Sequence, residues 1–419
     1  MGRDSCNQNG GRCIRFRVQT KPPCFNLKLL VKERFEHIAK ELSTGKYDVV
    51  ALQEVWNKSD YAVMCDKLSS TLPYSLYFYS GVIGSGMCVF SRYRITNSFT
   101  YRFSLNGYLY KLWHGDWLAG TSAGYCVIDH PIKPIHFFVS HLHAEYNRQD
   151  DEYLAHRVTQ AYQFAQLIEL ITKPSDCVIV CGDMNSEPTD LCYRILCNLP
   201  GLTDTWLECN KEGYHGNTYG VSHNSFAGST FQQAIQKGPS DGIRIDYIFY
   251  RGDRSNMELL DCHVTMSRIP GEEISYSDHE GVLATFCLKN DKVLEKGQEK
   301  VQQIESKCPT ETNQDKFRET LKEVSSMMSV KLSTTPYHRH ATALITALLM
   351  FIILPIFLPE GNLLLYSMGT CLGVGLYIAR ILCSMLVTAL VFYVFLNDRD
   401  EYHAYKDVYE AVNIRLVSL

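Results

Sequence analysis

The charged residues of this chain are distributed very unevenly along its 419 positions, and this distribution most strongly constrains its fold. Residues 341–396 contain only two charged side chains, Glu360 and Arg380, whereas the first three hundred residues mix charged and apolar side chains as globular domains do. Two stretches, one before Glu360 and one that includes Arg380, are apolar and long enough to cross ~30 Å of hydrocarbon. The sequence therefore predicts a globular domain followed by a transmembrane hairpin at residues 338–397.

Basic residues flank this predicted hairpin on both sides. Lys331 and Arg339 precede it, Arg399 and Lys406 follow it, and the loop between its two spans contains neither Lys nor Arg. Because Lys and Arg near membrane spans tend to stay in the cytosol, both ends of the hairpin are expected there. The polar N-terminus lacks the apolar stretch of a secretory signal. We therefore expect a multi-pass protein of the endoplasmic reticulum, nuclear or plasma membrane, with its main domain and its tail facing the cytosol.

Composition divides the chain further. The stretch before the hairpin is rich in Lys, Glu, Gln, Ser and Thr and has no long apolar run, which is typical of a linker. The predicted segments are an atypical N-terminal segment (1–29), a globular domain (30–290), a polar linker (291–337), the hairpin (338–397) and a cytosolic tail (398–419). The formal net charge of −4 provides no basic surface, so nucleic acid is not an expected partner.

The globular domain alternates strand-like segments with a few long helices. Compact apolar runs at 47–52 and 177–180 are typical of buried strands, and residues 152–171 have the spacing of an amphipathic helix. Further strands are predicted at 84–90, 125–128, 134–142, 243–250 and 282–288. This pattern predicts an α+β fold, in which a two-layer β-sandwich is flanked by helices.

Polar residues stand at the ends of two of these strands. Glu54 follows the run at 47–52, where a carboxylate suits Mg²⁺, although an ordinary solvated acid fits the position equally well. Asp183 and Asn185 follow the run at 177–180. Alternate residues of an extended segment point to the same side, so this pair could hold a nucleophilic water and a phosphate oxygen. A turn-capping role for the pair is the alternative.

Two further groups add candidates for proton transfer. His141 and His143 end another predicted strand, and spacing alone does not decide which imidazole would donate to a phosphate oxygen. Asp246 lies mid-strand among apolar neighbours and needs a partner, because an unpaired buried carboxylate is costly. His279 is the predicted partner and would act as general base towards an attacking water. Asp278 would lie beside the metal or its waters.

These residues resemble, in their order along the chain, the endonuclease/exonuclease/phosphatase superfamily with the pancreatic deoxyribonuclease-like fold. The strings that carry the resemblance are Gln53-Glu54-Val55, His141, Gly182-Asp183-Met184-Asn185, Arg244-Ile245-Asp246-Tyr247 and Ser277-Asp278-His279. Longer strings resemble the neutral sphingomyelinases of the sphingomyelin phosphodiesterase 2 type: Ser80-Gly81-Val82-Ile83-Gly84-Ser85-Gly86, His114-Gly115-Asp116-Trp117 and His141-Leu142-His143-Ala144-Glu145-Tyr146-Asn147-Arg148-Gln149.

The resemblance implies phospholipase C-type hydrolysis of a membrane phospholipid, sphingomyelin, to ceramide and phosphocholine. Mg²⁺ is the implied cofactor, with Mn²⁺ as a substitute, and lyso choline phospholipids are further candidate substrates. The resemblance places Glu54 at the metal, Asn185 at the substrate phosphate and His279 as proton acceptor. It also favours His141 over His143 as the assisting imidazole. A nuclease or an inositol-phosphate phosphatase of the same fold is the alternative.

The chain departs from this family at its first strand. Members carry Asn-x-Asn ahead of Cys-Trp there, whereas this chain reads Arg15-Phe16-Arg17-Val18-Gln19-Thr20-Lys21-Pro22-Pro23-Cys24, without Asn. We expect a replaced or altered first strand to weaken both folding and activity. A catalytically impaired protein that binds a lipid or a partner is therefore a second alternative.

Overall fold

The computed structural model describes residues 12–20, 28–108, 111, 114–209, 216–227, 241–252, 256–289, 311–353 and 370–419. In the first strand, at the start of the first helix and in parts of the last two helices, only the backbone is described. The chain forms two compact units, Met1–Thr320 and Leu321–Leu419.

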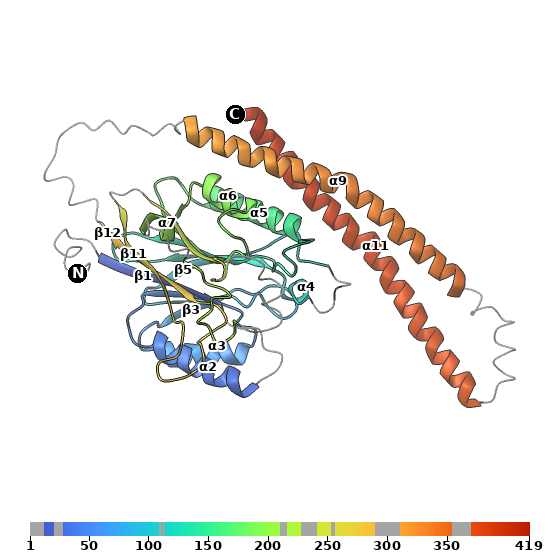
Figure 1. Ribbon diagram of the computed structural model, residues 1–419, viewed down its shortest axis with the longest axis horizontal. Helices are drawn as coiled ribbons and strands as arrows, with labels where there is room; N and C mark the ends of the chain where they lie inside the picture. The colour runs from blue at the N-terminus through green and yellow to red at the C-terminus, as the bar shows by residue number, and fades with distance from the viewer. Residues whose placement is uncertain are drawn as a thin grey trace. The chain divides into compact units, whose positions relative to one another are not determined.

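Two six-stranded mixed sheets form the centre of the first unit (Figure 1). The order in one sheet is β11 (Met257–Thr265), β12 (Gly281–Leu288), β1 (Arg12–Thr20), β2 (Val49–Gln53), β4 (Cys88–Ser91) and β3 (Tyr74–Tyr77). The order in the other is β5 (Ile95–Arg102), β6 (Ser122–Ile128), β7 (Ile135–His141), β8 (Cys177–Asp183), β10 (Asp246–Arg251) and β9 (Thr203–Asp204). The parallel pairs are β1 with β2 and β7 with β8.

Helices cover the outer face of each sheet (Figure 1). On one side, α2 (Lys28–Leu42) and α3 (Lys58–Leu68) pack buried side chains such as Ile38 and Leu68 against β2 and β4. On the other side lie α5 (Leu154–Ile171) and α6 (Leu191–Asn198). Two short helices, α4 (Asp116–Ala119) and α7 (Thr205–Cys209), lie in connections. The predicted β-sandwich flanked by helices is thus confirmed.

The main core lies between the two sheets. Side chains on alternate positions of each strand point into this space, as the period of two in a strand requires. Val49, Val89 and Phe286 come from one sheet, Phe137 and Ile179 come from the other, and all five are fully buried. This packing fixes the sheets against each other, so that residues at the strand ends are held in place.

The first strand, which the sequence predicted to be replaced or altered, forms in the structure. β1 lies in the middle of its sheet, antiparallel to β12 with Val18 opposite Val282, and parallel to β2 with Thr20 opposite Gln53. Residues 12–18 alternate in part between Arg and apolar side chains, a pattern compatible with a strand whatever motif it carries. The fold therefore keeps its central strand although the family's Asn-x-Asn is missing from it.

Two long helices make up most of the remaining described chain. α9 (Glu311–Ile353) runs without a break across the predicted boundary between linker and hairpin, and α11 (Thr370–Ser418) continues into the predicted tail. Within the second unit, Ser325 donates a hydrogen bond to Asn413 over 3.1 Å, which joins the two helices.

The predicted membrane hairpin lies largely outside what the structure describes. The end of its first span and the loop, residues 354–369, fall outside the described residues, as do most side chains on both sides of them. Among the residues that are described, no helix combines the length and the hydropathy needed to cross a membrane.

Candidate active site

Three strand ends meet at one edge of the second sheet. β7 ends at His141 and the parallel strand β8 ends at Asp183, and these two residues lie opposite each other in the ladder. β10 begins at Asp246, which pairs with Asp183 from the other side. The sequence had placed Asp246 in mid-strand, whereas it is the first residue of β10. The topology thus brings together three predicted site residues that are far apart in the sequence.

Gly182 allows β8 to approach β7 closely just before the site. Its φ is +140°, and a Cβ at this position would lie 1.8 Å from the backbone oxygen of Ser140. Since no side chain can replace glycine here without moving the backbone, the order Gly182-Asp183 has a steric cause. It places the Asp183 carboxylate 3.8 Å from Nε2 of His141.

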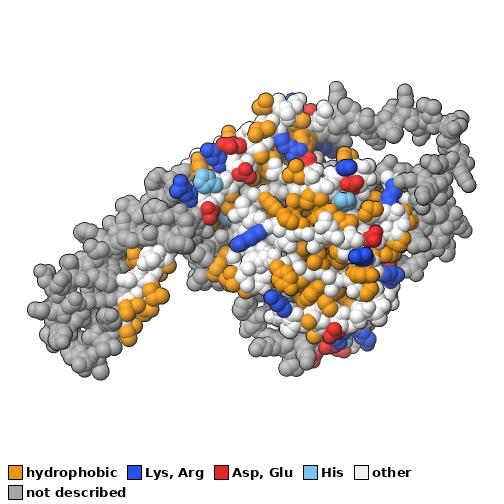
Figure 2. All heavy atoms as spheres, turned by 180° about the vertical axis from the view of Figure 1, so that it is seen from behind, with side chains coloured by type: hydrophobic (Ala, Val, Ile, Leu, Met, Phe, Trp, Pro, Cys, Tyr) orange, Lys and Arg blue, Asp and Glu red, His pale blue; other side chains and the backbone are white. Residues whose placement is uncertain are grey.

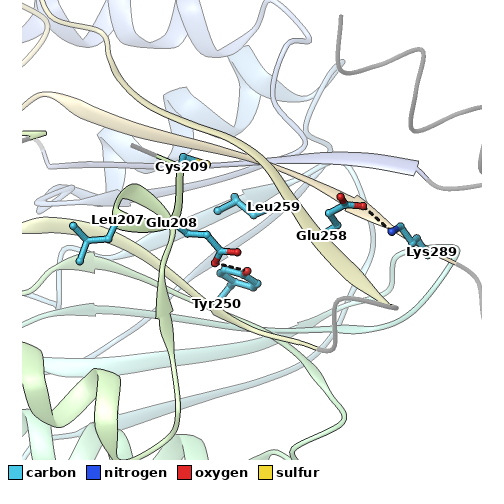
Figure 3. A pocket seen from close by; sticks show the side chains of 7 residues that line it. All are labelled: Leu207, Glu208, Cys209, Tyr250, Glu258, Leu259 and Lys289. Carbon is cyan, nitrogen blue, oxygen red and sulfur yellow. Dashed lines mark hydrogen bonds and ion pairs between the residues drawn. The ribbon is translucent and has the colours of Figure 1, made fainter. Parts of the chain in front are cut away.

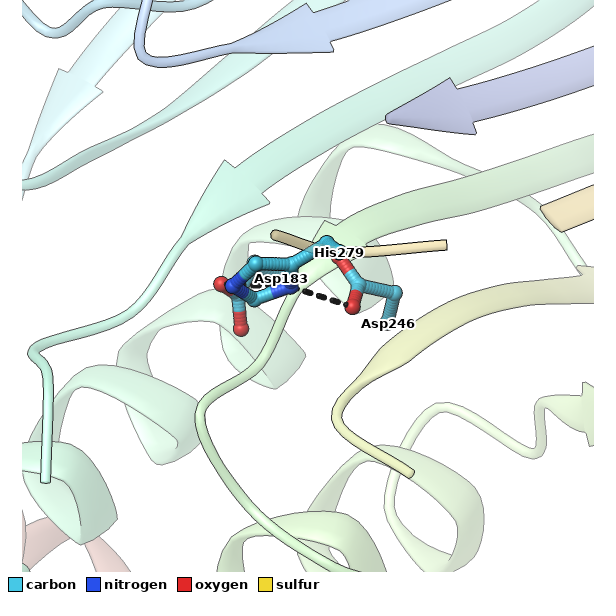
Figure 4. Close-up of side chains that lie close together, drawn as sticks. All are labelled: Asp183, Asp246 and His279. Carbon is cyan, nitrogen blue, oxygen red and sulfur yellow. Dashed lines mark hydrogen bonds and ion pairs between the residues drawn. The ribbon is translucent and has the colours of Figure 1, made fainter. Parts of the chain in front are cut away.

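Asp246 and His279 form the predicted pair (Figure 4). Nδ1 of His279 donates to Oδ2 of Asp246 over 2.8 Å, and both side chains are buried. Burial alone would lower the pKa of His279, but the carboxylates of Asp246, Asp183 and Asp278 raise that pKa to about 10. The hydrogen bond places a proton on Nδ1, which faces Asp246, so that Nε2 is the ring nitrogen available for proton transfer.

Asp183 completes a buried cluster with this pair. Burial and the nearby negative charge of Asp246 raise the pKa of Asp183 to about 8. One ligand atom from each of Asp183, Asp246 and His279 lies within 4.8 Å of the others, a spacing that a metal ion could use (Figure 4). However, Nδ1 of His279 donates its proton to Asp246 and therefore has no lone pair for a metal. We interpret this cluster as a group for proton transfer.

Asn185 does not continue the extended segment that the sequence indicated, because β8 ends at Asp183. Its neighbour Met184 is fully buried. The backbone N–H of Asn185 donates to Oδ1 of Asp183 over 2.9 Å, and its side-chain Nδ2 donates to the backbone oxygen of Leu142 over 2.8 Å. Asn185 has a positive φ of 44°, which Asn tolerates better than most residues. Both the predicted turn-capping contact and a partly accessible amide are thus present.

Glu54 has the properties of a cation ligand. It directly follows β2, and its Oε2 is buried without a hydrogen-bond partner among the described residues. Burial and the repulsion from Asp278 raise the pKa of Glu54 well above its usual range. A divalent cation bound by the two carboxylates would offset both the burial of the Glu54 charge and its repulsion from Asp278. Mg²⁺ suits this position because it prefers oxygen ligands. The residues present therefore fit the predicted metal.

Two residues beside the site, Asp116 and Tyr146, were not among the predicted ones, and both lie near His143, the imidazole that the resemblance disfavoured. Tyr146 donates to Oδ2 of Asp116 over 2.6 Å, and Nε2 of the fully buried His143 lies 4.0 Å from the same oxygen. Despite burial, the nearby His143 and Tyr146 lower the pKa of Asp116. The negative charge of Asp116 also adds to the raised pKa of Glu54 and opposes the burial that lowers the pKa of His141. The strings quoted for the family resemblance contain both Asp116 and Tyr146, so a signal was present without an assigned role.

A pocket in the same unit lies away from these residues (Figure 3). Its lining consists of Leu207, Glu208, Cys209, Tyr250, Glu258, Leu259 and Lys289. Tyr250 donates to Glu208 over 2.7 Å, and Lys289 pairs with Glu258 over 2.6 Å. Because Tyr250 lies towards the end of β10 remote from Asp246, this pocket does not belong to the candidate site.

The charge distribution agrees with the low net charge. On the face shown in Figure 2, Lys and Arg side chains lie interspersed with Asp and Glu and with apolar side chains.

Comparison with known proteins connects this geometry to one family. A sequence model of the Endonuclease/Exonuclease/phosphatase family matches residues 7–279. Over 277 residues, the chain is 38% identical to a sphingomyelin phosphodiesterase 2 of Mus musculus, covering 64% of each protein. It is 34% identical over 255 residues to an inositol phosphosphingolipids phospholipase C of Saccharomyces cerevisiae, covering 58% of this chain and 52% of the relative. The match thus spans less than two thirds of either relative.

Among solved structures, the D. rerio TDP2 complexed with single-strand DNA product superposes with a TM-score of 0.50 at 17% identity. The superposition covers 65% of this chain and 98% of that structure. At this identity the likeness concerns the fold alone.

Proposed function

The chain belongs to the Endonuclease/Exonuclease/phosphatase family, and from this premise we propose that it hydrolyses sphingomyelin to ceramide and phosphocholine. The observation that carries the proposal is the buried hydrogen bond between Asp246 and His279 at strand ends that also present Asp183 and His141. A proton-transfer pair beside a carboxylate cluster suits attack by water on a phosphodiester. The sphingomyelin phosphodiesterase name of the mouse relative indicates the substrate class.

In the proposed reaction, the oxygen of a water molecule attacks phosphorus and the bond from phosphorus to the ceramide oxygen breaks. In its neutral form, His279 accepts the proton of the water at Nε2, while Asp246 holds the ring by its Nδ1 proton. Asp183 orients the water and Asn185 contacts the phosphate. His141, whose pKa burial lowers, donates a hydrogen bond to a phosphate oxygen. The ceramide oxygen takes a proton from solvent water as it leaves, and His279 afterwards returns its proton to solvent.

Glu54 and Asp278 would hold Mg²⁺ at the edge of this site. Two observations support the assignment: the unpartnered Oε2 of Glu54 and the electrostatic coupling of the two carboxylates. When bound, Mg²⁺ or Mn²⁺ would polarise the phosphate and offset the negative charge of the carboxylates.

A direct assay tests this function. The full-length protein in mixed micelles should release phosphocholine from sphingomyelin with Mg²⁺ or Mn²⁺ present and lose that activity in EDTA. Lyso choline phospholipid and an inositol phosphosphingolipid, run in parallel, measure the headgroup preference. Metal-independent release would contradict the proposed mechanism, and release from the inositol lipid alone would contradict the proposed substrate.

We propose further that residues 338–397 anchor the enzyme in a membrane as a hairpin, with the catalytic unit on the cytosolic side. The proposal rests on the sequence, in which residues 341–396 contain two charged side chains. Extraction of cell membranes at alkaline pH should leave the protein in the membrane pellet. Its appearance in the soluble fraction would exclude a spanning anchor.

A catalytically impaired protein that binds a lipid or a partner is the second candidate function, and one observation favours it. Thr20 lies opposite Gln53, which precedes Glu54, and belongs to the region 18–20 in which the family resemblance expects Asn-x-Asn. If this side chain limits activity, Thr20→Asn should raise turnover and lower the Mg²⁺ concentration needed for half-maximal rate. The conservative Thr20→Ser serves as control. Equal rates for all three proteins would show that the departure is harmless.

A further inference from the structure

The loop between β3 and β4 exposes an unusual amount of apolar surface. Val82 is 81% exposed, Tyr79 is 62% exposed and Ile83 is 46% exposed. We call Tyr79, Val82 and Ile83 the apolar loop tip. Single exposed apolar residues are common, but three within five positions form a contiguous apolar feature that marks an interaction surface.

The backbone holds this tip outward. The N–H groups of Val82 and Ile83 both donate to the backbone oxygen of Leu118 in α4, over 2.8 and 3.3 Å. Gly81 has a φ of +55°, and a Cβ there would lie 2.3 Å from the backbone oxygen of Ala119. The close contact with α4 is thus possible only with glycine at this position. The exposure of Val82 follows from a fixed backbone.

The same loop forms part of the rim of the candidate site. Its last glycine, Gly86, accepts a hydrogen bond from the N–H of Val55, the residue after Glu54. The other contact of this loop is with α4. This helix begins with Asp116, whose negative charge adds to the raised pKa of Glu54 and opposes the lowering of the pKa of His141 by burial. The loop that carries the apolar loop tip is therefore joined by backbone hydrogen bonds to the segments that carry Glu54 and Asp116.

A cation accompanies the apolar side chains. Nζ of Lys58 lies 5.1 Å from the centre of the Tyr79 ring. Aromatic rings and Lys side chains together are typical of the boundary between hydrocarbon and headgroups, where the ring contacts apolar chains and the ammonium contacts phosphate. This combination distinguishes the tip from Leu170, which is 85% exposed near the end of α5.

We propose that the apolar loop tip inserts into the lipid surface that carries the substrate and so seats the active site over the headgroups. The inference rests on the proposed function, because only a lipid-bound phosphodiester requires the site to meet a membrane. A lipid surface is the occupant that matches both the apolar side chains and the adjacent Lys58. Insertion of the tip is separate from anchoring by residues 338–397.

Insertion can be measured without turnover. Full-length Val82→Trp should gain tryptophan fluorescence that is quenched by lipids brominated on their acyl chains, in phosphatidylcholine vesicles that also contain sphingomyelin. Leu170→Trp is the matched control, since α5 ends just before β8 begins, at the end of that strand remote from Asp183. Quenching of the added fluorescence should be at least about twofold stronger for Val82→Trp. Equal quenching of the two variants would overturn the proposal, whatever protein or segment then covered the tip.

Turnover gives a second test. For Val82→Asp, the ratio of phosphocholine release from vesicles to release from a soluble phosphocholine ester should fall about tenfold, because a charge at the tip opposes insertion. An unchanged ratio would contradict the inference. If the wild-type chain releases phosphocholine from neither substrate while Val82→Trp is still quenched, the proposed function fails and the lipid contact of the tip stands.

Discussion

Two aspartate and histidine pairs in this protein make almost the same hydrogen bond in opposite surroundings. His279 and Asp246 are joined over 2.8 Å in the buried site, whereas His263 and Asp261 are joined over 2.9 Å on the surface. The surface pair is about half exposed, with 49% and 58% of its side chains accessible. Water screens the exposed pair, so we expect the charge of Asp261 to act on its histidine more weakly than the buried charge of Asp246 acts on His279.

This contrast provides a controlled prediction for catalysis. Asp246→Asn should lower turnover of sphingomyelin by roughly 10³-fold, because an amide neither selects the required tautomer nor stabilises the protonated ring. Asp261→Asn removes the same kind of bond and should leave turnover unchanged. Phosphocholine release at saturating substrate measures both. Comparable rates for Asp246→Asn and the wild type would exclude His279 as a base oriented by Asp246.

The choice between His141 and His143 shows what spacing cannot provide. In a continuous strand, their separation by two residues would point both side chains to the same side. In the structure, β7 ends at His141, whose Nε2 lies 3.8 Å from Asp183, while His143 is fully buried and donates from Nδ1 to the backbone oxygen of Ala144. The difference depends on where the strand ends in three dimensions, which the local sequence does not contain.

Burial lowers the pKa of His143, despite the opposing charge of Asp116, and this makes stability depend on pH. Below about pH 6.5 the unfolded chain binds a proton at His143 that the folded protein does not yet bind. The free energy of unfolding therefore falls with decreasing pH, by at most ~1.4 kcal/mol per pH unit, until the lower folded pKa is reached. His143→Gln should show a shallower fall than the wild type between pH 6.5 and 5 in urea titrations. Parallel curves would contradict a depressed pKa.

At the level of elements, β1 shows how a missing motif can mislead. The absence of Asn led to the expectation of a damaged strand, yet Arg15-Phe16-Arg17-Val18 still alternates as a strand does, and both neighbours pair with it. Strand formation depends on periodicity and on partners, whereas a motif concerns chemistry at one end of the strand. The strands carrying Glu54, His141 and Asp183 could be predicted, but their pairing order could not, because it depends on contacts between distant segments.

The central position of β1 predicts strong sensitivity to proline. Val18→Pro should lower the free energy of unfolding by about 3 kcal/mol or more, since proline donates no hydrogen bond and disturbs a strand with neighbours on both sides. Tyr74→Pro, at the first residue of the edge strand β3, should cost much less. Urea unfolding followed by fluorescence compares the two variants. Equal losses would show that β1 is not a central strand in solution.

At the scale of the whole molecule, the two compact units predict two unfolding steps. All four tryptophans, Trp56, Trp113, Trp117 and Trp206, belong to Met1–Thr320, whereas α11 and most of α9 belong to the second unit. Fluorescence should therefore follow the first unit alone, while circular dichroism at 222 nm follows both. The two thermal curves should not coincide. A single shared midpoint would mean that the units unfold as one.

The pairing of β1 with β12 also governs when activity can first arise. Val18 and Val282 are neighbours in the sheet although more than two hundred residues separate them in the chain, and His279 lies just before β12. During synthesis, β1 leaves the ribosome long before its antiparallel partner exists, so its edge stays open to wrong pairing until residue 288 has emerged. β12, which follows the proposed base His279, is the strand that pairs with this edge of β1 and closes it. A growing chain therefore cannot carry out the proposed hydrolysis before its sheet is complete.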